Sequence, residues 1–275
     1  MKLGVRSSKL AIAYANKVID ALLFPDIEIA PIVTEGDVKS NTSIQEIGGK
    51  GVFVSEIEKH LLEGTIDIAV HSFKDLPAQM DDKLTISAVL ERNDPRDCYI
   101  GRLFPKARVG TGSPRRIAQL KNNFTVDFDI LPIRGNIDTR LQKLDNDQYD
   151  AIILAVAGLE ALGLENKITK ILPFDKMLPC VGQGTIAIQT RKDYEWHDKI
   201  QSICHMPTYY SVMAEREVLK VVDGDCHTAI GVISTLVGDC IMIRAYNYEN
   251  DKEYANMSKR TDYIELGREV GNKIK

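Results

Sequence analysis

The stretch DIAVHSFKDLP, residues 67–77, joins a short apolar run to a group of polar and charged residues. Residues 66–70 are rich in β-branched side chains, which predicts a buried strand. Four polar residues follow it: His71, Ser72, Lys74 and Asp75. In open α/β sheets, ligands bind just beyond the carboxyl ends of the strands. A lysine there can hold an anion and an aspartate can handle protons or positive charge, although a lone Lys–Asp pair is more often a solvated surface pair.

The surrounding residues alternate between strand and helix patterns. Strands are predicted at residues 2–5, 27–33 and 84–90, and helices after Ser8 and at residues 52–62. The order strand–helix–strand–helix–strand predicts a parallel α/β sheet. A charged, proline-containing segment, residues 92–97, then predicts a crossing into a second domain.

The second domain is expected to repeat this architecture around arginine-bearing turns. In GTGSPRR, residues 110–116, Ser113 is a good helix N-cap and Pro114 suits the first helical turn. Arg115 and Arg116 then lie beside free backbone N–H groups, an arrangement typical of an anion site. Two cations there oppose the helix dipole, and such a local conflict is typical of functional sites.

A second turn of the same kind follows a predicted strand at residues 125–131. Arg134 precedes the next helix and Arg140 lies one turn inside it. Residues 151–155 predict a fully apolar strand, and residues 157–162 begin a short helix.

The remainder of the chain predicts a return crossing and a small third domain. Residues 178–184 form a glycine-rich turn, and a strand at 185–189 is expected to rejoin the first domain. Beyond residue 205 we predict an α+β domain, with a helix at 211–222, strands at 230–236 and 241–248, and a helix at 263–274. The predicted domain limits are 1–92 with 184–204, 93–183, and 205–275.

Composition excludes several classes of protein. The 275 residues carry a net charge of −4, whereas general nucleic-acid binding needs a basic surface. No apolar run approaches the roughly 20 residues of a membrane span, and we expect no signal peptide, because the first residues enter a strand-like segment without an apolar signal-peptide region. The five widely spaced cysteines indicate reduced thiols in a cytoplasmic protein. The absence of CxxC and HExxH argues against a metal site.

Eight stretches, in order, resemble one family, the hydroxymethylbilane synthases, also called porphobilinogen deaminases. They are GGKGVFVSEIE (48–58), DIAVHSFKDLP (67–77), RNDPRD (92–97), GTGSPRR (110–116), RGNIDTRLQKL (134–144), YDAIILAVAGL (149–159), LPCVGQG (178–184) and AERE…DGDC (214–226). The resemblance implies two α/β lobes like those of periplasmic binding proteins, with the active cleft between them. It also implies a small α+β C-terminal domain with a dipyrromethane cofactor covalently attached to a cysteine.

The implied enzyme is a transferase of tetrapyrrole (haem) biosynthesis. It condenses four porphobilinogen molecules head to tail on the dipyrromethane primer, releases ammonia at each step, and hydrolyses off linear hydroxymethylbilane. A cytoplasmic monomer with this small-molecule substrate, and with no nucleic-acid, membrane or metal partner, is expected.

The resemblance also implies residue roles. Asp75 is the catalytic carboxylate, Cys226 the thioether attachment point and Lys50 part of an active-site loop. The expected cofactor-binding residues are Lys74, Ser72, Thr111, Ser113, Arg115, Arg116 and Arg140. The expected substrate-binding residues are Arg6, Ser8, Arg134, Arg140 and Gln183.

The proposed chemistry explains these residue types. Every pyrrole carries two carboxylates, which bidentate arginines hold better than lysines do. Loss of ammonia leaves an electrophilic azafulvene with positive charge on its ring, which one fixed carboxylate can stabilise. Cys226 lies in a tight Gly-Asp-Cys loop, whereas Cys98, Cys180 and Cys240 lie in or beside apolar segments typical of buried thiols.

The chain departs from the family pattern at several positions. Ala161 replaces a usual arginine, so one substrate carboxylate contact is either absent or supplied elsewhere. Asp225 and Gln189 replace a usual glycine and glutamate. The alternative is a non-catalytic two-lobed binding protein for a carboxylate or phosphate ligand. That alternative explains the arginine turns but not Asp75 or a loop cysteine in an added domain.

Overall fold

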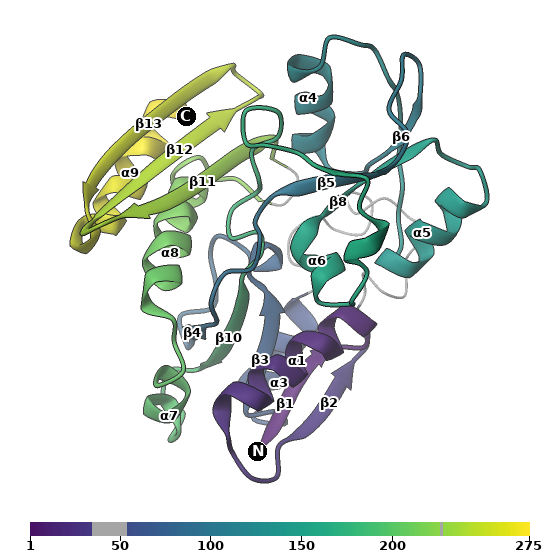
Figure 1. The fold of residues 1–275 in the computed structure, drawn as a ribbon. Helices are drawn as coiled ribbons and strands as arrows, with labels where there is room; N and C mark the ends of the chain where they lie inside the picture. The colour runs from purple at the N-terminus through teal and green to yellow at the C-terminus, as the bar shows by residue number, and fades with distance from the viewer. Residues whose placement is uncertain (35–53, 226–227) are drawn as a thin grey trace.

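The structure is a computed structural model that describes residues 1–34, 54–225 and 228–275. Two predicted site residues, Lys50 and Cys226, lie outside the described residues. The described strands form two sheets of five strands and one sheet of three. Figure 1 shows the N-terminal strands in purple, the middle of the chain in teal and the C-terminal sheet in yellow-green as three distinct bodies.

The first sheet confirms the predicted α/β lobe and corrects its strand directions. Its strand order is β2 (Glu28–Ile32), β1 (Lys2–Arg6), β3 (Ile68–Ser72), β10 (Ile186–Arg191) and β4 (Leu84–Val89). β1 is parallel to β2 and β3, but β10 is antiparallel to β3 and β4. The prediction of a purely parallel sheet was therefore wrong. β10 enters from the second lobe, with Ile186 opposite Ser72 at the end of β3, so it must run back along the sheet.

Helices cover both faces of this sheet because successive strand residues point to opposite sides. α1 (Lys9–Leu22) packs with Ile68 and Val70 on one face. α3 (Ser55–Leu62) packs with Ala69 on the other.

The second sheet repeats the same pattern. Its strand order is β7 (Asp129–Leu131), β6 (Arg108–Gly110), β8 (Ala151–Ala155), β5 (Asp97–Gly101) and β9 (Lys170–Ile171). The helices of this lobe are α4 (Pro114–Asn123), α5 (Ile137–Asp145) and α6 (Val156–Glu160). The sequence patterns missed β5 and β9, and the predicted strand at 125–131 shortens to β7. β5 was missed because its first residue belongs to the charged segment interpreted as a crossing.

The two connections between the lobes run side by side. The Asn93 amide donates to the Gly184 carbonyl at 2.9 Å, and the Leu90 amide donates to the Ile186 carbonyl at 3.1 Å. Gly184 has φ +87°, and a Cβ there would lie 2.6 Å from the Asn93 carbonyl oxygen. Only glycine suits that position.

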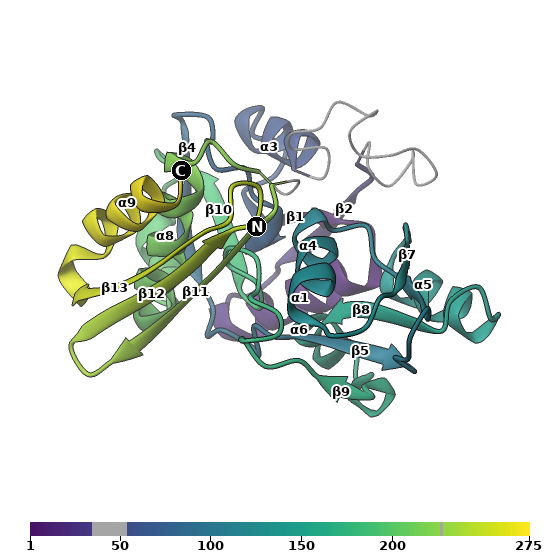
Figure 2. The same cartoon turned by 90° about the horizontal axis from the view of Figure 1, so that it is seen from above.

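The third sheet joins β11 (Ile230–Val237), β12 (Cys240–Asn247) and β13 (Lys252–Lys259) in antiparallel order. β13 was not predicted, because its sequence KEYANMSK alternates polar residues with few apolar ones. The helices are α8 (Met206–Val221) and α9 (Tyr263–Ile274), and the short α7 (His197–Gln201) precedes them. The view in Figure 2 shows α8 and α9 together on one side of this sheet.

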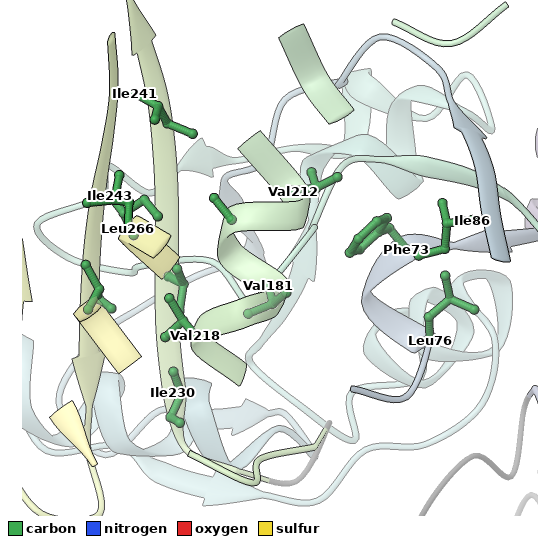
Figure 3. Packing of buried hydrophobic residues seen from close by; sticks show 14 of the residues in the cluster. Phe73, Leu76, Ile86, Val181, Val212, Val218, Ile230, Ile241, Ile243 and Leu266 are labelled. Atoms are coloured by element: carbon green, nitrogen blue, oxygen red, sulfur yellow. The ribbon is translucent and has the colours of Figure 1, made fainter. Parts of the chain in front are cut away.

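Helix α8 packs between the third sheet and the segment after β3. Figure 3 shows Val218 of α8 on the side of the helix that faces Ile230 and the sheet, whereas Val212 lies on the side that faces Phe73, with Leu76 and Ile86 beyond it. The C-terminal part of the chain therefore supports the turn that carries Lys74 and Asp75.

We propose that the three sheets are the cores of three domains with the limits 1–92 plus 184–204, 93–183 and 205–275. The connections described above support this division. A separate search for membrane spans finds no helix among the described residues with the length and apolar character that a bilayer crossing requires.

Candidate active site

Asp75 lies in a single 3₁₀ turn, Phe73–Asp75, directly after β3. The turn is fixed from beneath, because Phe73 is buried and its amide donates to the Thr185 carbonyl at 2.9 Å. The buried Arg216 of α8 donates to the Pro77 carbonyl, and its guanidinium carbon lies 5.9 Å from the centre of the Phe73 ring. Lys74 and Asp75 remain partly exposed above this support.

A cavity of about 940 Å³ opens beside this turn and is lined by residues of both α/β lobes. Among its described lining residues, eight arginine or lysine side chains outnumber three aspartates. The cavity contains eight of the residues predicted from the sequence, namely Arg6, Ser8, Ser72, Lys74, Asp75, Arg116, Arg134 and Arg140. Such an excess of positive charge in a concave site favours a ligand with several anionic groups.

Arg115 and Arg116 share a buried counterion, Asp97, which was not predicted from the sequence. Arg115 Nη2 lies 2.8 Å from Asp97 Oδ2, and Arg116 Nη2 lies 2.6 Å from Asp97 Oδ1. Arg116 also donates to the Ile153 carbonyl at 2.8 Å, and Arg115 donates to the Leu178 carbonyl at 2.5 Å. The conflict between two arginines and the dipole of α4 therefore has a structural cause, because Asp97 supplies the negative charge from β5.

Burial alone would raise the pKa of the Asp97 carboxyl, but the charges of Arg115 and Arg116 outweigh it and lower the pKa to about 2. Asp97 thus remains ionised throughout the neutral range. Asp97 is the last residue of RNDPRD and the first residue of the unpredicted strand β5, and this position is the signal that could have identified it.

Arg116, Arg134 and Arg140 lie close together, and not all of their buried N–H groups have hydrogen-bond acceptors among the described residues. Burial and the neighbouring charges of Arg116 and Arg134 lower the pKa of Arg140 to about 10, so Arg140 stays charged near pH 7. Arg116 Nε and Arg134 Nη1 are buried without a hydrogen-bond partner among the described residues. Buried N–H donors of a charged group without an acceptor are unfavourable, so these two favour an added anionic group.

Four other predicted residues do not line this cavity. Thr111 Oγ1 accepts from the Ser113 amide at 3.2 Å, and Ser113 Oγ caps α4. Gln183 is buried and donates to Asp97 Oδ1 at 3.0 Å, the oxygen that Arg116 also contacts, while Arg115 pairs with Asp97 Oδ2. Their binding roles stay predictions, and the contacts described here are internal to the protein.

His71, another polar residue of the segment 67–77, is buried in β3 and does not line the cavity. Its Nε2 is 3.0 Å from Gln189 Oε1. Burial is the main reason that the pKa of His71 falls to about 4, and the charge of Arg6 also lowers it. The imidazole is therefore neutral near pH 7.

Ala161 packs against the core of the first lobe and does not line the cavity. Three lysines, Lys9, Lys143 and Lys167, line the cavity in addition to the predicted residues.

A buried ion pair ties the crossing to the third domain. Arg92 Nη1 donates to Glu215 Oε1 of α8 at 2.6 Å, and Glu215 is fully buried. Glu215 also accepts from the Gly182 amide at 2.8 Å and from the Ser234 amide at 2.9 Å. This carboxylate joins the first crossing, the second crossing and β11, and thereby holds the cavity walls relative to one another.

Of the four described cysteines, only Cys98 is fully buried, whereas Cys180, Cys204 and Cys240 are partly buried. The expectation that Cys180 and Cys240 are buried thiols was therefore too strong. In the parts of the chain that the structure describes, no group of three or more His, Cys, Asp or Glu side chains could hold a metal ion.

Substitution of Asp97 by asparagine should lower the free energy of unfolding by about 3 kcal/mol or more, because two buried guanidinium groups lose their counterion. The measurement is urea unfolding at pH 7. The control is Asp239→Asn, because Asp239 is 98% exposed and lies 3.8 Å from Arg260, so its loss should cost less than about 1 kcal/mol.

The pH dependence has a defined sign. The pKa of Asp97 is lowered on folding, so its contribution is present above about pH 4 and is lost as the pH falls toward 2. The stability difference between the protein and Asp97→Asn should shrink in that window. An equally small effect of both substitutions at pH 7 would contradict this account.

Two family models match nearly the whole chain. One, porphobilinogen deaminase, dipyromethane cofactor binding domain, matches residues 1–199. The other, porphobilinogen deaminase, C-terminal domain, matches residues 209–275.

Curated relatives match over similar lengths. The porphobilinogen deaminase of Listeria welshimeri is 43% identical over 98% of this chain and 92% of its own length. That of Rickettsia prowazekii is 40% identical over 94% and 88%, and that of Caldicellulosiruptor saccharolyticus is 36% identical over 100% and 99%.

Solved structures with a detectable likeness include periplasmic binding proteins. The alkanesulfonate-binding protein of Xanthomonas axonopodis pv. citri has a TM-score of 0.40 and 14% identity, over 80% of this chain and 73% of that chain. The ectoine-binding protein of Halomonas elongata has a TM-score of 0.41 and 9% identity, over 74% of each chain. These scores are too low to support a further conclusion. The two family models and the curated relatives together establish that this chain belongs to the porphobilinogen deaminase family.

Proposed function

We propose that this chain is a hydroxymethylbilane synthase, which condenses four porphobilinogen molecules head to tail, releases ammonia and hydrolyses off linear hydroxymethylbilane. The observation that carries the proposal is the cationic cavity, in a chain of this family, with Asp75 in its wall. Porphobilinogen is a pyrrole with two carboxylates and one aminomethyl group, so it matches a site with many cations and one carboxylate near the reacting ring.

A dipyrromethane cofactor fits the residues present. It carries four carboxylates, and Arg116, Arg134 and Arg140 supply cationic donors, two of which have buried N–H groups without acceptors. We propose Cys226 as its attachment point, although that residue lies outside the described residues. When bound, the cofactor supplies a tethered primer, which makes each condensation effectively intramolecular.

The residues of the chain would then divide the work. Arg6, Ser8 and Arg134 bind the carboxylates of the incoming substrate, and Arg116, Arg140 and Lys74 bind those of the primer. Asp75 stabilises the positive charge that develops on the substrate pyrrole as ammonia leaves, because a fixed carboxylate in a partly desolvated cavity needs no reorganisation. Ser72 is proposed to bind the cofactor from the cavity wall. Thr111, Ser113 and Arg115 as cofactor-binding residues, Gln183 as a substrate-binding residue and Lys50 as an active-site residue remain proposals that rest on the family resemblance.

The family and the charge of the cavity support the proposed substrate. The expectations of a monomer and of a cytoplasmic location remain proposals that rest on the family resemblance. The alternative hypothesis, a carboxylate-binding protein without catalytic activity, explains the arginines of the cavity, but it gives no role to Asp75.

One experiment separates the two functions. The intact mass of the purified protein should exceed the sequence value by one covalent dipyrrole, and added porphobilinogen should be consumed with release of ammonia. A protein at the sequence mass that binds porphobilinogen without consuming it would be the binding protein instead. The mass and the ammonia are measured on the same preparation, so the activity can be compared directly with the amount of covalent dipyrrole in that sample.

A further inference from the structure

Tyr14 is a buried residue of the cavity wall to which the proposed function assigns no role. It lies on α1, is 6% exposed, and packs its ring into the core of the first lobe. It also lines the cavity together with Asp75. Among the described residues Tyr14 makes no hydrogen bond, and its hydroxyl oxygen is not one of the buried polar atoms that lack a partner, so the hydroxyl is accessible from the cavity.

The electrostatic surroundings of Tyr14 differ from those of the arginines. Burial is the main cause of its raised pKa, and the carboxylates of Asp75 and Glu160 add to it. Asp75 follows β3 in the first lobe and Glu160 ends α6 in the second, so negative charge acts on the hydroxyl from both lobes. The phenol of Tyr14 therefore stays protonated and neutral near pH 7. The lone pairs of its oxygen can accept a hydrogen bond from a ligand.

The charges that act on Tyr14 are opposite in sign to those of the arginines. Arg116, Arg134 and Arg140 form a positive wall, whereas the two charges that act on the Tyr14 hydroxyl, those of Asp75 and Glu160, are negative. Porphobilinogen carries both kinds of group, because its two carboxylates are anionic and its aminomethyl group is a cation when protonated. The positive wall repels that ammonium and attracts the carboxylates, so the substrate has one favourable orientation.

We propose that the Tyr14 hydroxyl oxygen, together with the Asp75 carboxylate, accepts hydrogen bonds from the protonated aminomethyl group of porphobilinogen, which makes Tyr14 a substrate-binding residue selective for the leaving amine. This inference rests on the proposed function. An ammonium group offers three N–H donors, which suits a carboxylate and a neutral phenol oxygen at the same position.

The chemical step balances with this arrangement. The bond between the methylene carbon and the nitrogen breaks, and its electron pair leaves with the nitrogen. The protonated amine therefore departs as neutral ammonia, and the pyrrole ring takes up the positive charge beside Asp75. No proton passes through Tyr14, whose part is to hold the amine in its protonated form until the bond breaks.

The test compares Tyr14→Phe with Tyr194→Phe. Phenylalanine keeps the buried ring of Tyr14 and removes only the hydroxyl group. Tyr194 is a suitable control because it is 8% exposed and belongs to the same core cluster without lining the cavity. Two ligands are used with cofactor-loaded protein: porphobilinogen, and an analogue with methyl in place of aminomethyl, which keeps both carboxylates and cannot react.

In Tyr14→Phe, kcat/KM for porphobilinogen should fall about tenfold to a hundredfold, as for loss of one hydrogen bond to a charged group. The inhibition constant of the methyl analogue should stay within about twofold, because its carboxylates meet the same arginines. Tyr194→Phe should change neither quantity. Glu160→Gln should shift the selectivity in the same direction by a smaller factor, without altering the packing of Tyr14.

An equal loss for both ligands in Tyr14→Phe would show a merely structural role and overturn the inference, and so would unchanged selectivity in both Tyr14→Phe and Glu160→Gln. Failure of the unmodified protein to consume porphobilinogen would overturn the proposed function itself. The two failures are therefore distinguishable.

Discussion

Replacement of Asp75 by asparagine should lower the rate of porphobilinogen consumption by about 10²–10⁴-fold, the range for loss of one electrostatic or acid–base group. Asparagine keeps the shape of the side chain and removes its charge. The positive charge on the substrate pyrrole would then face Arg116, Arg134 and Arg140 without an opposing carboxylate from the turn. The measurement is a single-turnover reaction at matched cofactor content, with mass spectrometry of the enzyme-bound oligopyrroles.

Asp75→Glu separates charge from placement. Glutamate keeps the negative charge but moves it by one methylene, so this variant should retain measurably more activity than Asp75→Asn. Both variants should fold, because Asp75 is partly exposed and the turn is held by Phe73 and by the Arg216 bond to Pro77.

The matched control for charge is Asp82→Asn, an exposed carboxylate a few residues further along that does not line the cavity. It should keep the rate of the unmodified protein. Elongation by Asp75→Asn at that same rate would remove the central claim about this carboxylate.

Replacement of Cys226 by serine should yield protein at the unmodified sequence mass and without synthase activity. Serine lacks the thiol that forms the thioether, so no primer would be anchored. Of the described residues on either side of Cys226, the Asp225 amide donates to Thr228 Oγ1 at 2.8 Å, between α8 and β11. Intact-protein mass spectrometry and porphobilinogen consumption measure the two effects independently.

Cys240→Ser provides the control, because Cys240 is a partly buried cysteine of β12 in the same domain. That variant should retain the dipyrrole adduct and its activity. A dipyrrole that persists on Cys226→Ser would place the attachment at another residue and refute this assignment.

Local patterns in the sequence were sufficient for the class of fold and for part of the site. The strand-like run before Ser72 is β3, residues 151–155 are β8, and Ser113 caps α4, each as predicted. These features depend on residues a few positions apart, where periodicity and capping chemistry act directly. The turn that carries Lys74 and Asp75 could also be predicted, because the change from apolar to polar residues marks the end of the strand before it.

Contacts between distant residues were decided only by the tertiary structure. Asp97 meets Arg115 and Arg116 because β5 pairs with β8, and no local pattern relates that carboxylate to the start of α4. The direction of β10 follows from its entry at the end of β3, and the position of Tyr14 in the cavity wall follows from the packing of α1. Strand pairing and burial bring such residues together across the chain, whereas spacing along the sequence records only which face of its own element each side chain occupies.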